Sequence, residues 1–189
     1  MARSGVTAER LTGAAADLAD EIGLPNVTVS AVARRFGVRP AALYAHIQDL
    51  RDLRLRVAEL ALTELADRAA AALAGRAGKE ALVACANTYR DYAKAHPGRY
   101  AATRVAMEPD TPAGRAAVRH SAMMRTILRG YRLPEPDQTD AIRMLGGMFH
   151  GFVDLEAAGG FRHHPREADA SWARILDALD AALRNWPAA

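Results

Sequence analysis

Residues 28–53 read TVSAVARRFGVRPAALYAHIQDLRDL, and this stretch decides the fold. Its apolar side chains recur with helical spacing at Val32, Phe36, Val38, Leu43 and Ile47. Ala33 and Gly37 lie between them, and residues this small allow two helices to cross closely at a steep angle. Pro40 suits the first position of a helix, because its missing N–H needs no partner there. The sequence therefore predicts a helix-turn-helix whose second helix runs from about Pro40 to His46.

The predicted helix-turn-helix is locally cationic. Residues 27–48 contain three arginines, at positions 34, 35 and 39, and no carboxylate, although the whole chain has a net charge of only +3. Phosphate is the natural partner of such a segment. A solvated hairpin with scattered arginines is the alternative, but a generic hairpin does not need Ala33, Gly37 and Pro40 at these offsets.

The second helix would present a distinctive outer face. Leu43 and Ile47 should point into the domain, which leaves the other side chains on or near the exposed side. Its small alanines would let the backbone sit deep in a major groove and touch thymine methyl groups. Tyr44 and His46 could donate hydrogen bonds to phosphate oxygens at the rim of the groove. This order of residue types indicates DNA as the partner.

Residues 7–53 resemble the DNA-binding segment of TetR-type bacterial transcriptional regulators. The resemblance rests on the Ala-x-x-x-Gly-Val core and on the Ala-Leu-Tyr-x-His run, which coincide in register. It implies phosphate contacts early in the first motif helix, groove-facing positions at the start of the second helix, and DNA-backbone contacts near its end. These positions are, in that order, Thr28 and Ser30; Arg39, Ala41 and Ala42; and Tyr44 and His46.

One position departs from the family pattern. Members usually carry a lysine at the start of the next helix, where it reaches a phosphate, and this chain has Leu50 there. Either Arg51 makes that contact from the neighbouring position, or the contact is absent. We include Arg51 among the expected DNA-binding residues.

Composition predicts an all-α protein. Alanine is abundant, β-branched residues are sparse, and long windows carry helical periodicity without sustained strand alternation. The single cysteine, Cys85, excludes an intrachain disulfide; its apolar helical context favours a buried thiol over a redox switch. The chain has no signal-peptide pattern and no apolar run of membrane length, so we expect a cytoplasmic protein.

The pattern predicts two domains. A helix-turn-helix DNA-binding domain covers residues 1–53, and a C-terminal ligand-binding and dimerisation domain covers residues 54–189. Helices are expected over about 7–23, 28–36, 40–46, 49–74, 79–95, 100–105, 112–130, 138–158 and 169–186, with threonine caps at Thr7, Thr28 and Thr111. The helix from about residue 49 to 74 would begin in the first domain and end in the second, so it is the expected transmission element.

The last two helices carry surplus apolar surface. The first of them contains Gly146, Gly147 and Gly151, and each glycine inside a helix costs about 1 kcal/mol relative to alanine. Close approach of another helix would compensate for that cost, and two such helices from each of two subunits would form a four-helix bundle. The residues expected at this homodimer interface are Gly147, His150, Gly151, Trp172, Ile175, Leu176, Leu179 and Leu183.

Residues 144–161, MLGGMFHGFVDLEAAGGF, resemble the C-terminal regulatory domain of a TetR subgroup with a Trp-His-Gly signature. Here phenylalanine replaces the tryptophan, since the triplet is residues 149–151. The family resemblance implies a cavity in this domain and release of DNA when a small molecule binds. Few charges fall among the candidate lining residues, so we expect a small apolar or weakly polar effector. These candidates are Tyr89, Tyr92, Tyr100, Met107, Met123 and Phe149.

The sequence indicates no catalytic or metal site and no cofactor. It lacks a nucleophile elbow, a phosphate-binding glycine loop and a zinc-protease pattern. His163 and His164 lie in one loop without a second ligand cluster, and His150 is expected to be a core or interface residue. The expected function is a ligand-responsive repressor that binds a near-palindromic operator as a homodimer. Two alternatives stay open: a helix-turn-helix protein whose second domain only dimerises, and a small-molecule enzyme on a helical fold.

Overall fold

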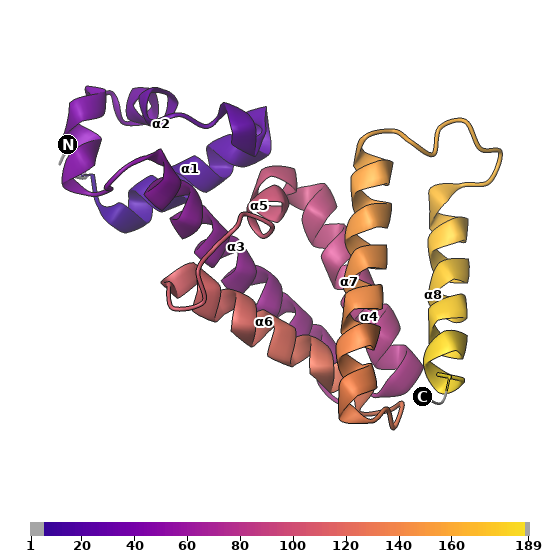
Figure 1. Ribbon diagram of the computed structural model, residues 1–189. Helices are drawn as coiled ribbons and strands as arrows, with labels where there is room; N and C mark the ends of the chain where they lie inside the picture. Colours follow the sequence, from indigo (N-terminus) through magenta and orange to yellow (C-terminus); the bar gives the residue numbers. More distant parts are fainter. Residues whose placement is uncertain (1–5, 188–189) are drawn as a thin grey trace. The chain divides into compact units, whose positions relative to one another are not determined.

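The computed structural model describes residues 6–187, which form helices and connecting loops without a β-strand (Figure 1). The helices in chain order are α1 (Ala8–Ile22), the 3₁₀ helix η1 (Leu24–Asn26), α2 (Val29–Phe36), the 3₁₀ helix η2 (Pro40–Ala45), α3 (Leu50–Leu73), α4 (Gly78–Ala95), α5 (Pro97–Ala102), α6 (Pro112–Leu128), α7 (Glu135–Ala157) and α8 (Ala168–Arg184). The predicted all-α class is confirmed. None of the described helices combines the length and apolarity needed to cross a membrane.

The described chain divides into two compact units. Unit 1 contains the residues up to 64 together with 95–118, and unit 2 contains 65–94 together with the residues from 119 onward. The predicted boundary after residue 53 divides a DNA-binding domain from a ligand-binding and dimerisation domain, and it stays a prediction. The compact units divide the chain differently, because α5 packs against α1 and so joins the N-terminal segment.

Threonine hydroxyls cap three helices where the sequence predicts them. Each Oγ1 atom accepts a backbone N–H from the first helical turn, which satisfies a donor that has no partner inside the helix. The donor–acceptor distances are 3.3 Å for Arg10 and Thr7, 3.1 Å for Ala31 and Thr28, and 3.0 Å for Gly114 and Thr111. These caps fix the starts of α1, α2 and α6.

The turn between α2 and η2 follows the prediction. Gly37 adopts the left-handed conformation with φ 63°, and its N–H closes the end of α2 on the carbonyl oxygen of Arg34 at 3.1 Å. Leu43 and Ile47 are 0% and 3% exposed, and both belong to the core of unit 1. The crossing predicted for residues 28–47 is therefore present.

The second motif helix is a 3₁₀ helix rather than an α-helix. Its bonds join residues three apart, from the Ala42 N–H to Arg39 at 3.0 Å and from the His46 N–H to Leu43 at 2.8 Å. A segment of six residues that starts with proline forms few internal bonds, and short helical pieces of this kind commonly adopt the tighter 3₁₀ form.

Helix α5 starts earlier than predicted. The sequence His96-Pro97-Gly98 looks like a helix breaker, and the helix was expected over about 100–105, but α5 occupies Pro97–Ala102. Proline is tolerated at the first helical position. Gly98 lets the start of α5 lie directly on α1, since a Cβ atom there would lie 2.0 Å from the carbonyl carbon of Ala19. A tertiary contact therefore explains this glycine.

Unit 2 is built from the last part of α3, α4, the later part of α6, and the pair α7 and α8. Figure 1 shows α7 and α8 side by side, joined by a long loop over residues 158–167. Their aromatic rings meet in the interior, with ring centroids 6.0 Å apart for Phe149 and Trp172. Tyr89 of α4 joins the same cluster, 5.6 Å from Phe149. This cluster forms the centre of the unit.

Candidate functional site

The outer face of η2 is the most distinctive feature of unit 1. Ala41, Ala42 and Tyr44 are exposed, and Tyr44 is 55% exposed although it is a large hydrophobic residue. Leu43 is fully buried between them. His46 is half-buried at the end of the helix, so it lies at the edge of this face. The arrangement places small side chains in the middle of the face and hydrogen-bonding side chains at one end.

The 3₁₀ geometry changes which side chains share this face. With three residues per turn, side chains at positions i and i+3 eclipse one another. Ala41 is therefore aligned with Tyr44, and Ala42 is aligned with Ala45, which is also exposed. Ala45 was not among the expected DNA-binding residues, because an α-helical spacing was assumed for this segment.

The start of α2 supplies two more of the expected residues. Thr28 and Ser30 are both exposed, although the Thr28 hydroxyl already accepts the Ala31 N–H. That oxygen still has its own proton and a second lone pair, so capping leaves the hydroxyl able to donate to another group.

The cationic character of the segment is partly neutralised. Arg34, Arg35 and Arg39 are exposed, but the Arg35 guanidinium pairs with Glu21 of α1. Arg39 stands immediately before η2 in an extended conformation, with φ −74° and ψ 146°. Arg39 is therefore the arginine nearest in the chain to the exposed alanines.

At the start of α3, Leu50 and Arg51 differ in their exposure to solvent. Leu50 is half-buried and Arg51 is exposed, so Arg51 is the one available to an external partner. Asp49 caps this helix by accepting the Asp52 N–H at 2.7 Å, and Asp52 in turn accepts the Gln48 N–H at 2.9 Å. These reciprocal bonds hold the backbone from which Arg51 projects.

Arg54 supports the motif in a way that sequence reasoning missed. Its guanidinium donates to the carbonyl oxygens of Pro25 at 3.1 Å and Val27 at 3.3 Å. These contacts tie the segment before α2 to α3. No local pattern marks the role, because the partners are backbone atoms 29 and 27 residues away.

The six residues expected to line an effector cavity do not lie in one unit. Tyr100 and Met107 belong to unit 1, where Met107 packs against the hydrophobic core. The other four belong to unit 2: Tyr89, Tyr92 and Phe149 are buried, and Met123 is half-buried. Only these four could form a single site within unit 2.

His120 extends this group and was not predicted. Its Nε2 atom is hydrogen-bonded to the hydroxyl oxygen of Tyr89, and its Nδ1 atom is buried without a partner among the described residues. Burial, with a smaller contribution from nearby His150, lowers the pKa of His120 to about 4. A neutral ring with one unused nitrogen thus lies beside the aromatic cluster.

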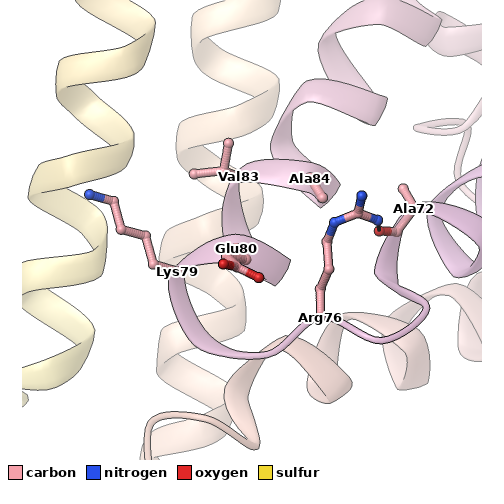
Figure 2. Close-up of a pocket in the computed structure, with 6 residues that line it drawn as sticks. All are labelled: Ala72, Arg76, Lys79, Glu80, Val83 and Ala84. Atoms are coloured by element: carbon pink, nitrogen blue, oxygen red, sulfur yellow. Dashed lines mark hydrogen bonds between the residues drawn. The ribbon is translucent and has the colours of Figure 1, made fainter.

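A surface pocket of unit 2 lies elsewhere, where α3 turns into α4 (Figure 2). It has a volume of about 550 Å³ and none of the expected effector residues line it. Arg76 donates to the carbonyl oxygen of Ala72, and Lys79 pairs with Asp177 at 2.9 Å, so its cations already have partners. Glu80 lines the same pocket, so the pocket also presents a carboxylate (Figure 2).

Half of the expected homodimer residues are covered by their own chain. The apolar stripe of α8 packs inside unit 2, where Trp172 contacts Phe149 and Phe152 of α7 and donates a hydrogen bond to Asn87 of α4. The residues concerned are Trp172, Leu176, Leu179 and Leu183. Of the expected set, this leaves Gly147 and Gly151 exposed and His150 and Ile175 half-buried.

The glycines of α7 have no intrachain explanation. A Cβ atom at Gly146, Gly147 or Gly151 would meet nothing within 4 Å outside the helix itself. Alanine would therefore fit at each position and would favour the helix by about 1 kcal/mol. The subunit itself therefore gives no structural reason for glycine at these positions.

Metal-ligand and catalytic clusters do not stand out in the region described. No three His, Cys, Asp or Glu side chains of residues 6–187 are grouped so that they could hold a metal ion. Cys85 is buried, and burial raises the pKa of its thiol to about 12, which keeps it protonated and unreactive.

Sequence relatives are regulators of transcription. Residues 82–179 match the family described as tetracyclin repressor-like, C-terminal domain. The uncharacterised helix-turn-helix regulator YobS of Bacillus subtilis (strain 168) is 29% identical over 184 residues, which cover 97% of this chain and 92% of YobS. The uncharacterised helix-turn-helix regulator Rv0681 of Mycobacterium tuberculosis is 33% identical over 153 residues, which cover 80% of this chain and 70% of Rv0681.

Solved structures share the fold at lower identity. A possible TetR family transcriptional regulator from Streptomyces coelicolor A3(2) has a TM-score of 0.74 and 20% identity, and covers 95% of this chain and 100% of its own. A TetR variant from Acinetobacter baumannii, in complex with minocycline, also has a TM-score of 0.74 and 20% identity, and covers 98% of this chain and 100% of its own.

Proposed function

The chain belongs to the TetR family of transcriptional regulators, and from that premise we propose a homodimeric, ligand-responsive repressor that binds a near-palindromic DNA operator. One observation carries the DNA-binding part: Leu43 is buried in η2 while Ala41, Ala42 and Tyr44 face outward. Its relatives are regulators rather than enzymes, so we propose no catalytic activity. Because its target is genomic DNA, the protein would act in the cytoplasm.

In this proposal η2 lies in the major groove. Ala41, Ala42 and Arg39 face base edges, while Tyr44 and His46 bind the phosphates beside the groove. Thr28, Ser30 and Arg51 would add contacts to the DNA backbone. The 3₁₀ form brings Ala45 alongside Ala42, which widens the small-residue face that could approach thymine methyl groups.

The dimer would use the exposed side of α7. Gly147 and Gly151 lie four residues apart and therefore on one face of the helix, and neither is needed as glycine within the subunit. Close packing of the partner's helix against this face would account for both glycines. His150 and Ile175 would lie at the edge of the same interface. Two subunits would present their η2 helices about 34 Å apart, which matches successive major grooves.

The effector would bind in the interior of unit 2. Tyr89, Tyr92, Met123 and Phe149 offer an apolar surface, and the unused Nδ1 atom of His120 offers one hydrogen bond. A small, largely apolar molecule with a single hydroxyl or amide group suits this combination. Binding would favour a conformation whose DNA-binding heads no longer match the operator, which requires different affinities for the two states.

The test measures binding of the purified protein to its own upstream DNA by fluorescence anisotropy, with a scrambled duplex for comparison. We expect a preference of about 10³-fold or more for the upstream duplex and two chains per site. Ala42→Glu provides a matched, folded control, because an exposed carboxylate at this position would repel phosphate. Equal affinity for both duplexes would refute operator recognition.

A thermal-shift screen then tests the response to effector. A compound that raises the melting temperature should also weaken operator binding, and His120→Phe should abolish both effects. If no compound that stabilises the protein changes its DNA affinity, the effector-free alternative would be favoured.

A further inference from the structure

The loop between α7 and α8 covers a second pocket of unit 2, with a volume of about 420 Å³. We call it the loop pocket; its walls include Phe152 of α7, Phe161 of the loop and Ile175 of α8. The polar residues that line the pocket include His164 and Arg166 of the loop and Ser171 of α8. The volume falls within the range of small-molecule sites, about 300–1,000 Å³.

The inner wall of the loop pocket is aromatic. The ring centroids of Phe152 and Phe161 lie 4.7 Å apart, and Trp172 packs on the other side at 4.8 Å from Phe152. Phe161 is half-buried, so part of its side chain is still exposed to water. An apolar group of a ligand could therefore contact Phe152, Phe161 and Ile175 and remove their remaining surface from water.

The loop above this wall is cationic. It contains two exposed arginines, Arg162 and Arg166, against one acidic residue, Glu167, and the exposed His163 and His164 belong to the same loop. Arg166 and His164 line the loop pocket and also a neighbouring hollow of about 250 Å³, and Arg162 and Glu167 line only that hollow. Arg166 is thus the cationic side chain that lines the loop pocket.

The other carboxylates near the loop are already engaged. Arg90 of α4 is 7% exposed and donates to Glu156 at 2.8 Å and to Asp169 at 2.6 Å. Lys94 adds a contact to Glu156 at 3.3 Å. These pairs hold the end of α7 and the start of α8, and they offset the two negative charges that would oppose an anion. With these two carboxylates paired, the two arginines of the loop outnumber its one carboxylate, Glu167.

We infer that the loop pocket binds an amphipathic carboxylate, whose apolar body lies against Phe152, Phe161 and Ile175 and whose carboxylate pairs with Arg166. A neutral apolar ligand would leave the guanidinium unused, and an amphipathic amine would meet it with like charge. Ser171 lies on the same pocket and can donate a second hydrogen bond to the carboxylate. This site shares no residue with the proposed interior effector site or with the proposed DNA-binding residues, and its wall includes Ile175, which we placed at the edge of the proposed dimer interface.

Trp172 provides the readout, because it packs on Phe152 at the back of the loop pocket. The chain has two tryptophans, so a Trp186→Phe background leaves Trp172 as the single indole fluorophore. The probes are octanoate, octan-1-ol and octylammonium, titrated into the full chain without DNA. We expect a saturable change with octanoate, at least tenfold weaker binding of octan-1-ol, and no saturable change with octylammonium.

Two arginines of the same loop supply a matched pair of variants. Arg166→Gln should weaken octanoate binding about tenfold and leave octan-1-ol binding unchanged, because it removes one charge-assisted contact. Arg162→Gln should change octanoate binding by less than about twofold, since Arg162 does not line the loop pocket. Ser171→Asp should abolish octanoate binding, and an unchanged melting temperature in each variant shows that the fold is retained.

Three outcomes would overturn the inference: no saturable response to octanoate, equal binding of octanoate and octan-1-ol, or equal losses from Arg162→Gln and Arg166→Gln. The last result would indicate a diffuse charge on the loop rather than a site. None of these measurements involves DNA, so their failure leaves the proposed repressor function untouched.

Discussion

The backbone of Gly98 lies directly on the backbone of Ala19. A Cβ atom on Gly98 would fall 2.0 Å from both the carbonyl carbon and the carbonyl oxygen of Ala19, and 2.5 Å from the nitrogen of Asp20. Asp20 strengthens the same contact, because its carboxylate accepts the Arg99 N–H at 2.8 Å and contacts the His96 Nδ1 atom at 3.1 Å. The start of α5 is thus fixed on α1.

Gly98→Ala should therefore destabilise the protein strongly. The added methyl group meets backbone atoms that cannot rotate away, so α5 must separate from α1, and we expect a loss of at least about 2 kcal/mol in the free energy of unfolding. Gly13→Ala in α1 is the control: its Cβ meets nothing within 4 Å, and alanine should add about 1 kcal/mol. Urea denaturation measures both. Similar stabilities for the two variants would contradict the close approach.

Stability should fall in mild acid because of His120. Burial lowers its pKa to about 4, against about 6.5 in the unfolded chain. Between these values the unfolded state binds more protons, so the free energy of unfolding decreases as the pH drops from about 6.5 toward 4, by at most about 1.4 kcal/mol per pH unit. His120→Gln should reduce this slope. Parallel pH profiles for the two proteins would assign the acid sensitivity to other groups.

Arg90 should contribute far more to the free energy of unfolding than its neighbour Lys94. The Arg90 guanidinium pairs with Glu156 and Asp169 and lies over the rings of Phe152 and Trp172, at 5.4 and 5.3 Å. Hydrogen bonds from Arg90 hold the pKa of Glu156 below its usual range. Arg90→Met should cost about 3 kcal/mol, because it leaves Glu156 without its main partner. Lys94→Met removes a half-exposed cation and should cost less than about 1 kcal/mol. Equal costs in denaturant titrations would contradict this ranking.

The DNA-binding residues should separate into two classes. Tyr44→Phe and His46→Ala should weaken binding to specific and random duplexes alike, since both side chains are proposed to contact phosphates. Arg39→Ala should also relax base preference, by about 1–3 kcal/mol at the base pair it contacts. Anisotropy titrations on operator and scrambled duplexes distinguish the two behaviours. An equal loss on both duplexes for Arg39→Ala would remove that residue from the base-reading set.

The dimer should depend on the size of residue 147. Gly147→Leu places a bulky side chain on the exposed face of α7 and should raise the dimer dissociation constant at least tenfold, whereas Gly147→Ala should have a much smaller effect. Both variants should keep the helical fold, since Gly147 is exposed and a Cβ atom there would meet nothing within 4 Å. Analytical ultracentrifugation measures the outcome. An unchanged dimer in Gly147→Leu would place the interface elsewhere.

Much of the fold could be predicted because its determinants are local. Thr7, Thr28 and Thr111 each cap a helix through a bond to a residue three positions away, so the cap and its partner are read from one short window. The burial of Leu43 and Ile47 beside exposed Tyr44 follows from helical spacing in the same way. Local spacing did not distinguish a 3₁₀ helix from an α-helix over six residues, and Ala45 was missed for that reason.

Contacts between distant residues could not be predicted. Tyr89 and His120 are 31 positions apart, and Arg54 and Val27 are 27 positions apart. Neither pair produces a periodic pattern in the sequence. The apolar stripe of α8 was predicted to lie at a homodimer interface, whereas Trp172, Leu176, Leu179 and Leu183 are already buried within the single subunit. Trp172 and Leu176 could equally have met a partner subunit.

The sequence by itself determined the all-α class, the threonine caps and the outward face of the helix-turn-helix, because periodicity and capping depend on neighbours within one or two turns. Only the tertiary structure decided that α5 rests on α1 through Gly98, that the stripe of α8 belongs to its own subunit, and that Arg90 joins the ends of the α7–α8 loop. Those outcomes depend on which surfaces pack against each other. The hydrophobic effect that drives this packing is non-directional, so an apolar stripe in the sequence does not specify which surface will cover it.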